Sequence, residues 1–213
     1  MLAKREVSVL VHDAVQLEGI NFTLPEIQTL MDGITVGGHK LSDQQIAINQ
    51  AKAWEQLFED VKDGAFAFSR AYACLLHGIA GKEEALEWGQ LRSGSVIIAG
   101  TDYMPPTAQE LPELFDCLDG ELAVIDDVYN KATLAFLRMA RAQFFYDVNK
   151  RMGRFMMNGI LLYYGYPVIN VPAKRKLEFN EKMLAFYESN NPVSMQEFLI
   201  SCLDERILKI MEE

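Results

Sequence analysis

The stretch that most constrains this chain is residues 143–166, where a basic segment runs directly into a long apolar one. The apolar run at residues 155–166 predicts a helix that begins near Asn149. Lys150, Arg151 and Arg154 then fall in the first turns of that helix, where the positive end of the helix dipole disfavours cations. A conflict of this kind is expected where a functional site has been built.

A bound anion would resolve this conflict. The free backbone N–H groups at a helix start, together with the guanidinium groups of Arg151 and Arg154, can hold a phosphate. The alternative is a solvated helix start that happens to be basic. We therefore predict an anion site at the head of this helix and keep the alternative open.

Composition limits the class of protein. A chain of 213 residues is long enough for one domain with a full core, and 50% hydrophobic with 23% charged residues is typical of a globular protein in water. The net charge of −10 argues against general nucleic-acid binding, which needs a basic face. No apolar run approaches the ~20 residues of a membrane span, and the first residues do not form a secretory signal. We expect a cytoplasmic protein that binds neither nucleic acid nor membrane.

Hydrophobic periodicity is helical through most of the chain. It predicts helices at residues 41–63, 65–79, 107–118, 121–142, 149–165, 173–188 and 194–211, with a further short one at 82–91. Residues 94–100 differ, because they are β-branched and flanked by glycines, which predicts a strand or small hairpin. The expected fold class is all-α, mainly a helical bundle, with one small β-hairpin flap.

At this point the residues carry a resemblance to a known family. Residues 143–154 resemble the signature of the Fic (filamentation-induced-by-cAMP) family, His-x-Phe-x-Asp/Glu-Gly-Asn-Gly/Lys-Arg-x-x-Arg, with matches at Phe145, Asp147, Asn149, Lys150, Arg151 and Arg154. Residues 155–167 resemble the core helix of that family and its Gly-Tyr-Pro exit, and residues 89–106 resemble its substrate-positioning flap. The resemblance implies a Fic domain at 41–213, preceded by an N-terminal segment at 1–40 that holds a candidate inhibitory helix.

The family implies a chemistry for these positions. Fic proteins typically transfer AMP from ATP to a hydroxyl group of a target protein. The resemblance gives Asp147 the role of holding a magnesium ion against the phosphates, in keeping with the oxygen ligands that this ion prefers. The phosphates themselves would be held by the backbone and side chains that follow: Val148, Asn149, Lys150, Arg151 and Arg154. ATP and Mg²⁺ are the cofactors that this implies.

The resemblance also implies a partner. The target protein is not identified by the sequence, and we expect it to dock on the flap around Val96 to Gly100. Self-association into a homo-oligomer is left open.

Two positions depart from the family pattern. Gln143 stands where the family has its general-base histidine, and a glutamine amide cannot take up a proton near neutral pH. General-base catalysis typically contributes roughly 10²–10⁴-fold, although glutamine can still orient a hydroxyl group. Val148 stands where the family has glycine. If that backbone must adopt a positive φ, a β-branched residue is costly there.

The N-terminal segment carries a second similarity. Residues 14–21 are similar to the autoinhibitory motif Ser/Thr-x-x-x-Glu-Gly/Asn of Fic proteins, with Ala14 at its first position. The implied role of Glu18 is an ion pair with Arg154 that blocks the phosphate site. The alternative is an ordinary helix end at Gly19.

Three functions remain open on the sequence. The first is a Fic-type protein AMP transferase, autoinhibited by Glu18 and of low activity. The second is a catalytically inactive Fic pseudoenzyme that binds nucleotide. The third is an interaction module whose flap adds a strand to a partner protein.

Overall fold

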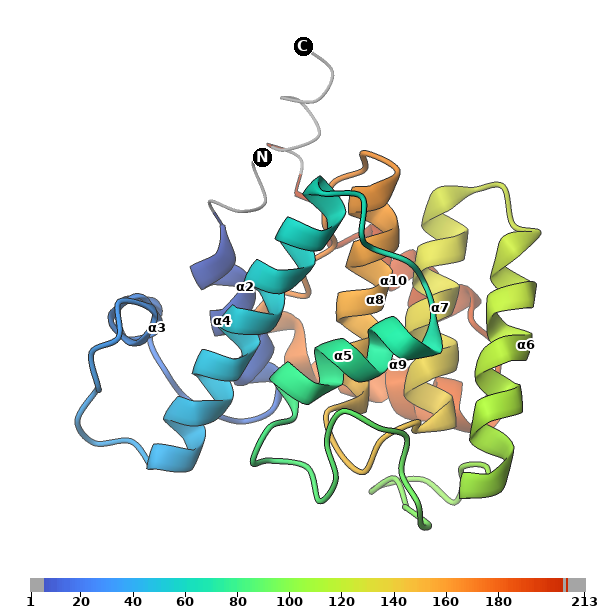
Figure 1. The fold of residues 1–213 in the computed structure, drawn as a ribbon, viewed down its shortest axis with the longest axis horizontal. Helices are drawn as coiled ribbons and strands as arrows, with labels where there is room; N and C mark the ends of the chain where they lie inside the picture. The colour runs from blue at the N-terminus through green and yellow to red at the C-terminus, as the bar shows by residue number, and fades with distance from the viewer. Residues whose placement is uncertain (1–5, 205, 207–213) are drawn as a thin grey trace.

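The computed structural model describes residues 6–204 and 206, and the regular structure in these ranges is helical (Figure 1). In chain order the elements are α2 (Val7–Leu17), α3 (Leu24–Met31), α4 (Leu41–Lys62), α5 (Arg70–Ala80), η1 (Ala108–Glu110), α6 (Leu111–Ala123), α7 (Val128–Ala142), α8 (Asn149–Tyr163), η2 (Ala173–Arg175), α9 (Lys176–Ser189) and α10 (Val193–Ile200). No helix within the described ranges is both long and apolar enough to cross a membrane.

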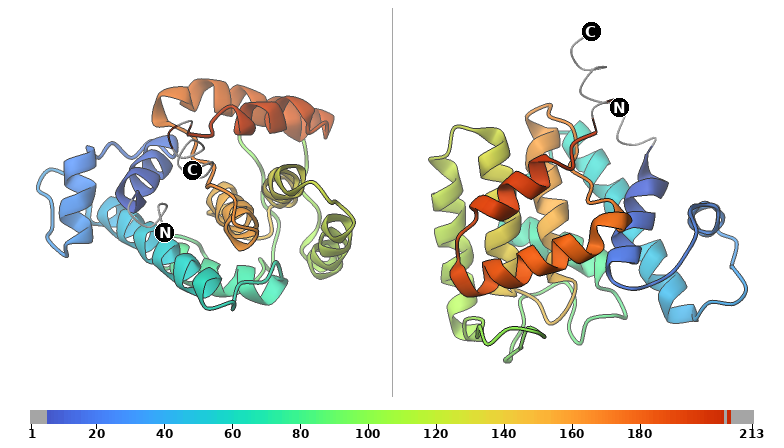
Figure 2. Two further views of the ribbon diagram at one scale, coloured as in Figure 1. Left: turned by 90° about the horizontal axis from the view of Figure 1, so that it is seen from above. Right: turned by 180° about the vertical axis from the view of Figure 1, so that it is seen from behind.

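Helix α8 lies at the centre of the bundle. Every residue from Asn149 to Leu161 except Lys150 is buried, and a helix that is buried all round must be enclosed by other elements. In the left view of Figure 2, α8 lies between α4 and α7, and α9 with α10 forms a further layer. The basic head of the predicted helix is therefore part of the protein interior.

Close packing of α8 depends on its glycines. A Cβ atom added at Gly153 would lie 2.9 Å from the carbonyl oxygen of Phe136 on α7. At Gly159 the added atom would overlap the ring of Phe66. Real Cβ contacts are longer than this, so both positions allow an approach that alanine would obstruct.

The end of α2 is fixed beside the head of α8. The Asp13 carboxylate accepts hydrogen bonds from Asn170 Nδ2 at 2.6 Å and from the Ala173 amide at 3.0 Å. Lys176, the first residue of α9, donates from Nζ to the carbonyl oxygen of Gln16 at 3.0 Å. These contacts hold the last turn of α2, and therefore Glu18, against the C-terminal part of the chain. The predicted boundary at residue 40 stays a prediction.

The predicted β-hairpin is wrong. Residues 94–105 form a loop, and the described part of the chain contains no strand. A two-stranded hairpin alone is marginally stable in water. Here the two arms of the loop are held by Arg92, which donates to the carbonyl oxygens of Gly94 and Pro106, and not by bonds to each other. We use the name flap for residues 94–106.

Several predicted helix bounds also change. The helices predicted to begin at residues 41 and 149 are confirmed. The predicted helix 121–142 is broken, because α6 continues to Ala123 and α7 begins at Val128 after Asp127, whose side chain accepts from the Asn130 amide at 2.8 Å. Residues 82–91 form turns instead of a helix, and α10 ends at Ile200. Residues 205 and 207–211 of the predicted last helix lie outside the described residues.

Candidate functional site

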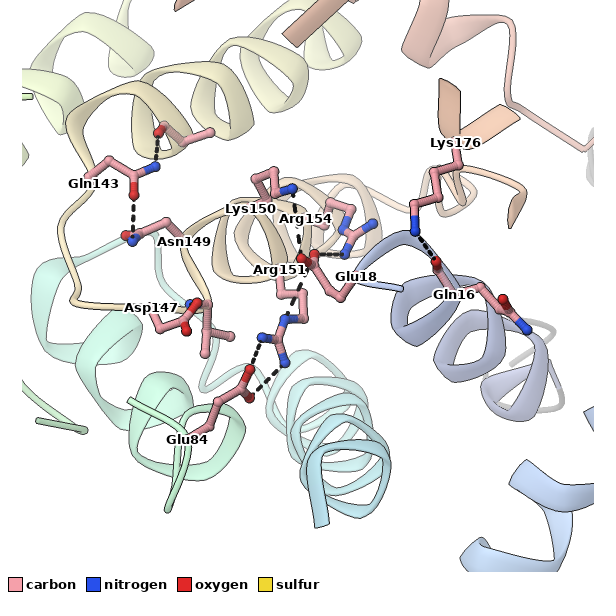
Figure 3. A network of polar contacts seen from close by, with 12 residues as sticks. Gln16, Glu18, Glu84, Gln143, Asp147, Asn149, Lys150, Arg151, Arg154 and Lys176 are labelled. Carbon is pink, nitrogen blue, oxygen red and sulfur yellow. Dashed lines mark hydrogen bonds and ion pairs between the residues drawn. The ribbon is translucent and has the colours of Figure 1, made fainter. Parts of the chain in front are cut away.

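The loop between α7 and α8 is closed by Asn149. Its Oδ1 accepts from the Phe145 amide at 2.9 Å, and its Nδ2 donates to the Phe145 carbonyl oxygen at 2.7 Å. The same Nδ2 group donates to Gln143 Oε1 at 3.0 Å (Figure 3). These bonds satisfy both backbone groups of Phe145, its N–H and its carbonyl oxygen. We call residues 143–148, which are held in this way at the head of α8, the cradle.

Val148 occupies the strained position of this cradle. Its backbone lies in the left-handed region with φ 66° and ψ 8°, and its side chain is buried. The cost that we predicted for a β-branched residue applies here, since this conformation favours glycine. The Val148 amide donates to the Asp147 carboxylate at 2.6 Å, so a phosphate that bound this N–H group would displace that carboxylate oxygen.

A cavity of about 520 Å³ lies in front of the cradle. The loop 143–148, the start of α8, the flap, α9 and the residue that follows α2 all contribute to its wall. The residues that line it are Glu18, Ile97, Ile98, Ala99, Gln143, Tyr146, Asp147, Val148, Asn149, Lys150, Arg151, Asn180, Met183, Leu184 and Tyr187. The structure therefore brings the predicted site residues other than Arg154 to one cavity, and Arg154 lines a smaller pocket to which Arg151 also contributes.

Glu18 lies among the three cations at the head of α8. Its carboxylate oxygens are 3.6 Å from Arg154 Nη2, 3.7 Å from Lys150 Nζ and 4.0 Å from Arg151 Nε (Figure 3). Burial raises the pKa of Glu18, but attraction to these cations outweighs burial and the net pKa is lowered. At these distances the contacts are ion pairs without hydrogen bonds.

Two buried donors of the arginines are left unpaired. Within the described residues, Arg151 Nε and Arg154 Nη2 have no hydrogen-bond partner. Burial, and then repulsion from Arg151, lowers the pKa of Arg154 to about 10, although Glu18 raises it. Buried donors without hydrogen-bond partners are unfavourable, so both groups are free to donate a hydrogen bond to an oxygen atom of a ligand.

Glu84 is a residue at this site that the sequence did not reveal. It accepts from Arg151 Nη1 at 2.9 Å through Oε2, and its Oε1 accepts from Arg151 Nη2. Burial lowers the pKa of Arg151, but this paired carboxylate and Glu18 raise it above its usual range. Glu84 lies 67 residues before Arg151, on the turn after α5, so no local pattern connects them.

Gln143 is held by the protein at both ends of its amide. Its Nε2 donates to the Ala140 carbonyl oxygen at 2.6 Å, and its Oε1 accepts from Asn149. The side chain at the position of the family's base therefore helps to shape the cradle, and it offers no proton acceptor of useful basicity.

Asp147 is the carboxylate that a metal ion could use. It is exposed and lines the cavity. No group of three or more His, Cys, Asp or Glu side chains in the described ranges could hold a metal ion. Magnesium is commonly bound by one or two carboxylates together with phosphate oxygens and water. The site fits such an ion when a phosphate ligand completes its shell.

Comparison with known proteins agrees with this architecture. The fold is shared with a Fic domain containing signaling protein from Bacteroides thetaiotaomicron, with a TM-score of 0.81 at 20% identity over 93% of this chain and 82% of that one. A Fic family protein from Desulfovibrio desulfuricans has a TM-score of 0.81 at 21% identity, over 98% of this chain and 66% of that one. These likenesses define an all-helical Fic fold.

The sequence comparisons point the same way. Residues 67–161 match the sequence model of the Fic/DOC family. The chain is 22% identical over 174 residues to the protein adenylyltransferase Fic of Drosophila willistoni, which covers 79% of this chain and 34% of that protein. The chain thus spans about a third of the length of the curated relatives it matches.

Proposed function

We propose that this chain binds ATP with magnesium at the head of α8 and is an autoinhibited protein AMP transferase of low activity. The observation that carries the proposal is the pair of buried N–H donors, Arg151 Nε and Arg154 Nη2, that have no hydrogen-bond partner in the described structure. Arg151 lines the cavity, and Arg154 Nη2 lies 3.6 Å from Glu18, which lines the cavity too. An oxygen of a phosphate would satisfy both, and the positive end of α8 adds to its attraction.

Different residues of the chain would contact different parts of the nucleotide. Arg154 and Lys150 neutralise phosphate charge, while the cradle shaped by Asn149 offers backbone N–H groups. Asp147 would hold magnesium, which supplies charge neutralisation at the phosphates when it is bound. The nucleoside would extend along α9, past Asn180 and Tyr187.

The proposed reaction is a substitution at the α-phosphorus of ATP. A bond forms between a hydroxyl oxygen of the target protein and the α-phosphorus, and the bond from that phosphorus to its bridging oxygen breaks. Pyrophosphate leaves, and the hydroxyl proton passes to solvent because Gln143 cannot accept it. Transfer is therefore slow, by roughly the 10²–10⁴-fold that a general base contributes.

Autoinhibition follows from the place of Glu18. Its carboxylate lies where a phosphate would meet Arg154, at 3.6 Å from Nη2. Because two negative groups cannot share this position, the nucleotide must displace Glu18. The wide spacing of its contacts, without a hydrogen bond, is in keeping with a carboxylate that can be displaced.

The target protein would approach over the flap. Ile97 is 79% exposed at the rim of the cavity, and the arms of the flap form no backbone hydrogen bonds with each other in the described structure. An extended segment of a partner could pair with this free backbone and place its hydroxyl group in the cavity.

Binding is the first test. Calorimetry with ATP and magnesium should show tighter binding to Glu18→Gly than to the unaltered chain, and loss of binding when Arg154→Ala is added. Arg138→Ala is the matched control, because Arg138 pairs with Glu121 away from the cavity. Absence of binding by Glu18→Gly at millimolar ATP would refute the proposal.

Transfer is the second test. The Glu18→Gly chain, incubated with a cell lysate, should label protein from ATP that carries its label at the α-phosphate. ATP labelled at the γ-phosphate should give no label beyond that of the same lysate without the chain, since pyrophosphate leaves.

A second candidate is supported by the contacts of Gln143. With both ends of its amide engaged by Ala140 and Asn149, the chain could bind nucleotide and transfer nothing. This pseudoenzyme would bind ATP as above, show no labelling as Glu18→Gly, and gain labelling as Glu18→Gly with Gln143→His.

A further inference from the structure

Arg151 is shared unequally between two carboxylates. Both of its terminal nitrogens are bound by Glu84, one at 2.9 Å, while its Nε lies 4.0 Å from Glu18 Oε1. Figure 3 shows the two carboxylates approaching the guanidinium group from different elements. Paired N–H donors on one carboxylate form the strongest arrangement that an arginine makes. Glu18 therefore makes the weaker contact with Arg151.

The backbone that carries Glu84 is fixed independently of α2. The amides of Glu84 and Ala85 donate to the Gly81 carbonyl oxygen at 3.1 and 3.0 Å, and Ala85 is buried. Asn49 of α4 donates to the Lys82 carbonyl oxygen at 2.8 Å. Because these contacts do not involve Glu18, the Glu84 pair can persist when Glu18 moves away.

We propose that Glu84 is a positioning residue that competes with Glu18 for Arg151 and so keeps the Glu18 contact weak enough for a ligand to displace. Without the Glu84 charge, the two terminal nitrogens of Arg151 are free to turn toward Glu18, 4.0 Å from its Nε. The Glu18 carboxylate would then gain hydrogen bonds that it lacks now. That the displacing ligand is a nucleotide rests on the proposed function. The competition between Glu84 and Glu18 for Arg151 is a property of the chain without ligand.

The first test is made without ligand and measures how firmly the turn that carries Glu18 is held. The amides of Glu18 and Gly19 donate to Val15 and Gln16 at the end of α2, and their hydrogen exchange reports how firmly this turn is held. Glu84→Gln should slow their exchange by about threefold or more, within the coupling expected of contacting charges. Glu83→Gln, which removes the same charge from an exposed neighbour, should leave exchange unchanged. Unchanged or faster exchange in Glu84→Gln overturns the proposal, because loss of a simple structural contact would loosen the site.

Binding provides the second readout. Calorimetry with ATP and magnesium should show that Glu84→Gln weakens binding about fivefold when Glu18 is present and not at all when Glu18→Gly is also present. Equal losses in both backgrounds would mean that Glu84 only anchors Arg151, and would overturn the competition. If the Glu18→Gly chain binds no nucleotide, the proposed function fails while the exchange experiment still decides the role of Glu84.

Discussion

Arg92 donates its Nε hydrogen to the carbonyl oxygen of Gln143 at 2.6 Å and so ties the flap to the cradle at the head of α8. Its backbone amide donates to the Phe144 carbonyl oxygen at 3.0 Å, and its other nitrogens bind the two arms of the flap. The side chain is 2% exposed. This one buried guanidinium group therefore fixes the position of the flap relative to the cradle.

Replacement of Arg92 should show this link. Arg92→Ala leaves three carbonyl oxygens without their donor, so we expect a loss of roughly 3 kcal/mol in the free energy of unfolding, measured by urea denaturation. Arg138→Ala removes an arginine that is only partly buried and pairs with Glu121, and it should cost less than about 1 kcal/mol. Similar losses for the two variants would contradict the role of Arg92.

The left-handed backbone at Val148 should reverse the usual order of stability of alanine and glycine replacements. Val148→Ala and Val148→Gly both remove the two buried γ-methyl groups of Val148, but only glycine also removes Cβ and so relieves the left-handed strain. We expect Val148→Gly to be more stable than Val148→Ala by about 1 kcal/mol in urea denaturation.

Val11 provides the control for that comparison, because it is fully buried in the regular helix α2. There alanine should be the more stable replacement by about 1 kcal/mol. The same order at both positions would show that Val148 is not strained.

The approach of α7 to α8 predicts opposite effects of one substitution at two glycines. Gly153→Ala places a methyl group 2.9 Å from the Phe136 carbonyl oxygen and should lower the free energy of unfolding by roughly 1–3 kcal/mol. Gly120→Ala on α6 meets no atom within 4 Å and should raise it by up to about 1 kcal/mol. Thermal denaturation of both variants checks the prediction, which a neutral Gly153→Ala would refute.

Glu18 should make stability depend on pH in a defined window. Its folded pKa is lowered from the ordinary value of 4.5 by the net attraction of the surrounding cations. The stability that the carboxylate contributes is therefore complete above pH 4.5 and is lost as the pH falls through the lower folded pKa.

Glu18→Gln isolates this contribution. At pH 7 we expect the variant to be less stable than the unaltered chain, by less than the roughly 3–5 kcal/mol of a fully buried pair because the contacts lack hydrogen bonds. Below pH 4.5 the difference should shrink. Urea denaturation at several pH values gives the difference, and a gap that grew in acid would contradict the sign.

Local patterns in the sequence determined the helical class, the start of α8 at Asn149 and the cations in its first turns. These depend on periodicity and on neighbours in the chain, which act over short separations. Because the Fic family has glycine at the position of Val148, the sequence predicted that valine would be costly there if the backbone were left-handed. The conformation itself came from the structure.

Tertiary packing decided what each charge meets. The pair of Glu84 with Arg151 joins residues 67 positions apart, and the flap is held open by Arg92 where a hairpin was predicted. Ion pairs and hydrogen bonds between distant segments depend on how helices pack, and a one-dimensional pattern contains no such distances. The sequence alone therefore determined that cations gather at the head of a buried helix, and the folded chain decided which carboxylate holds each of them.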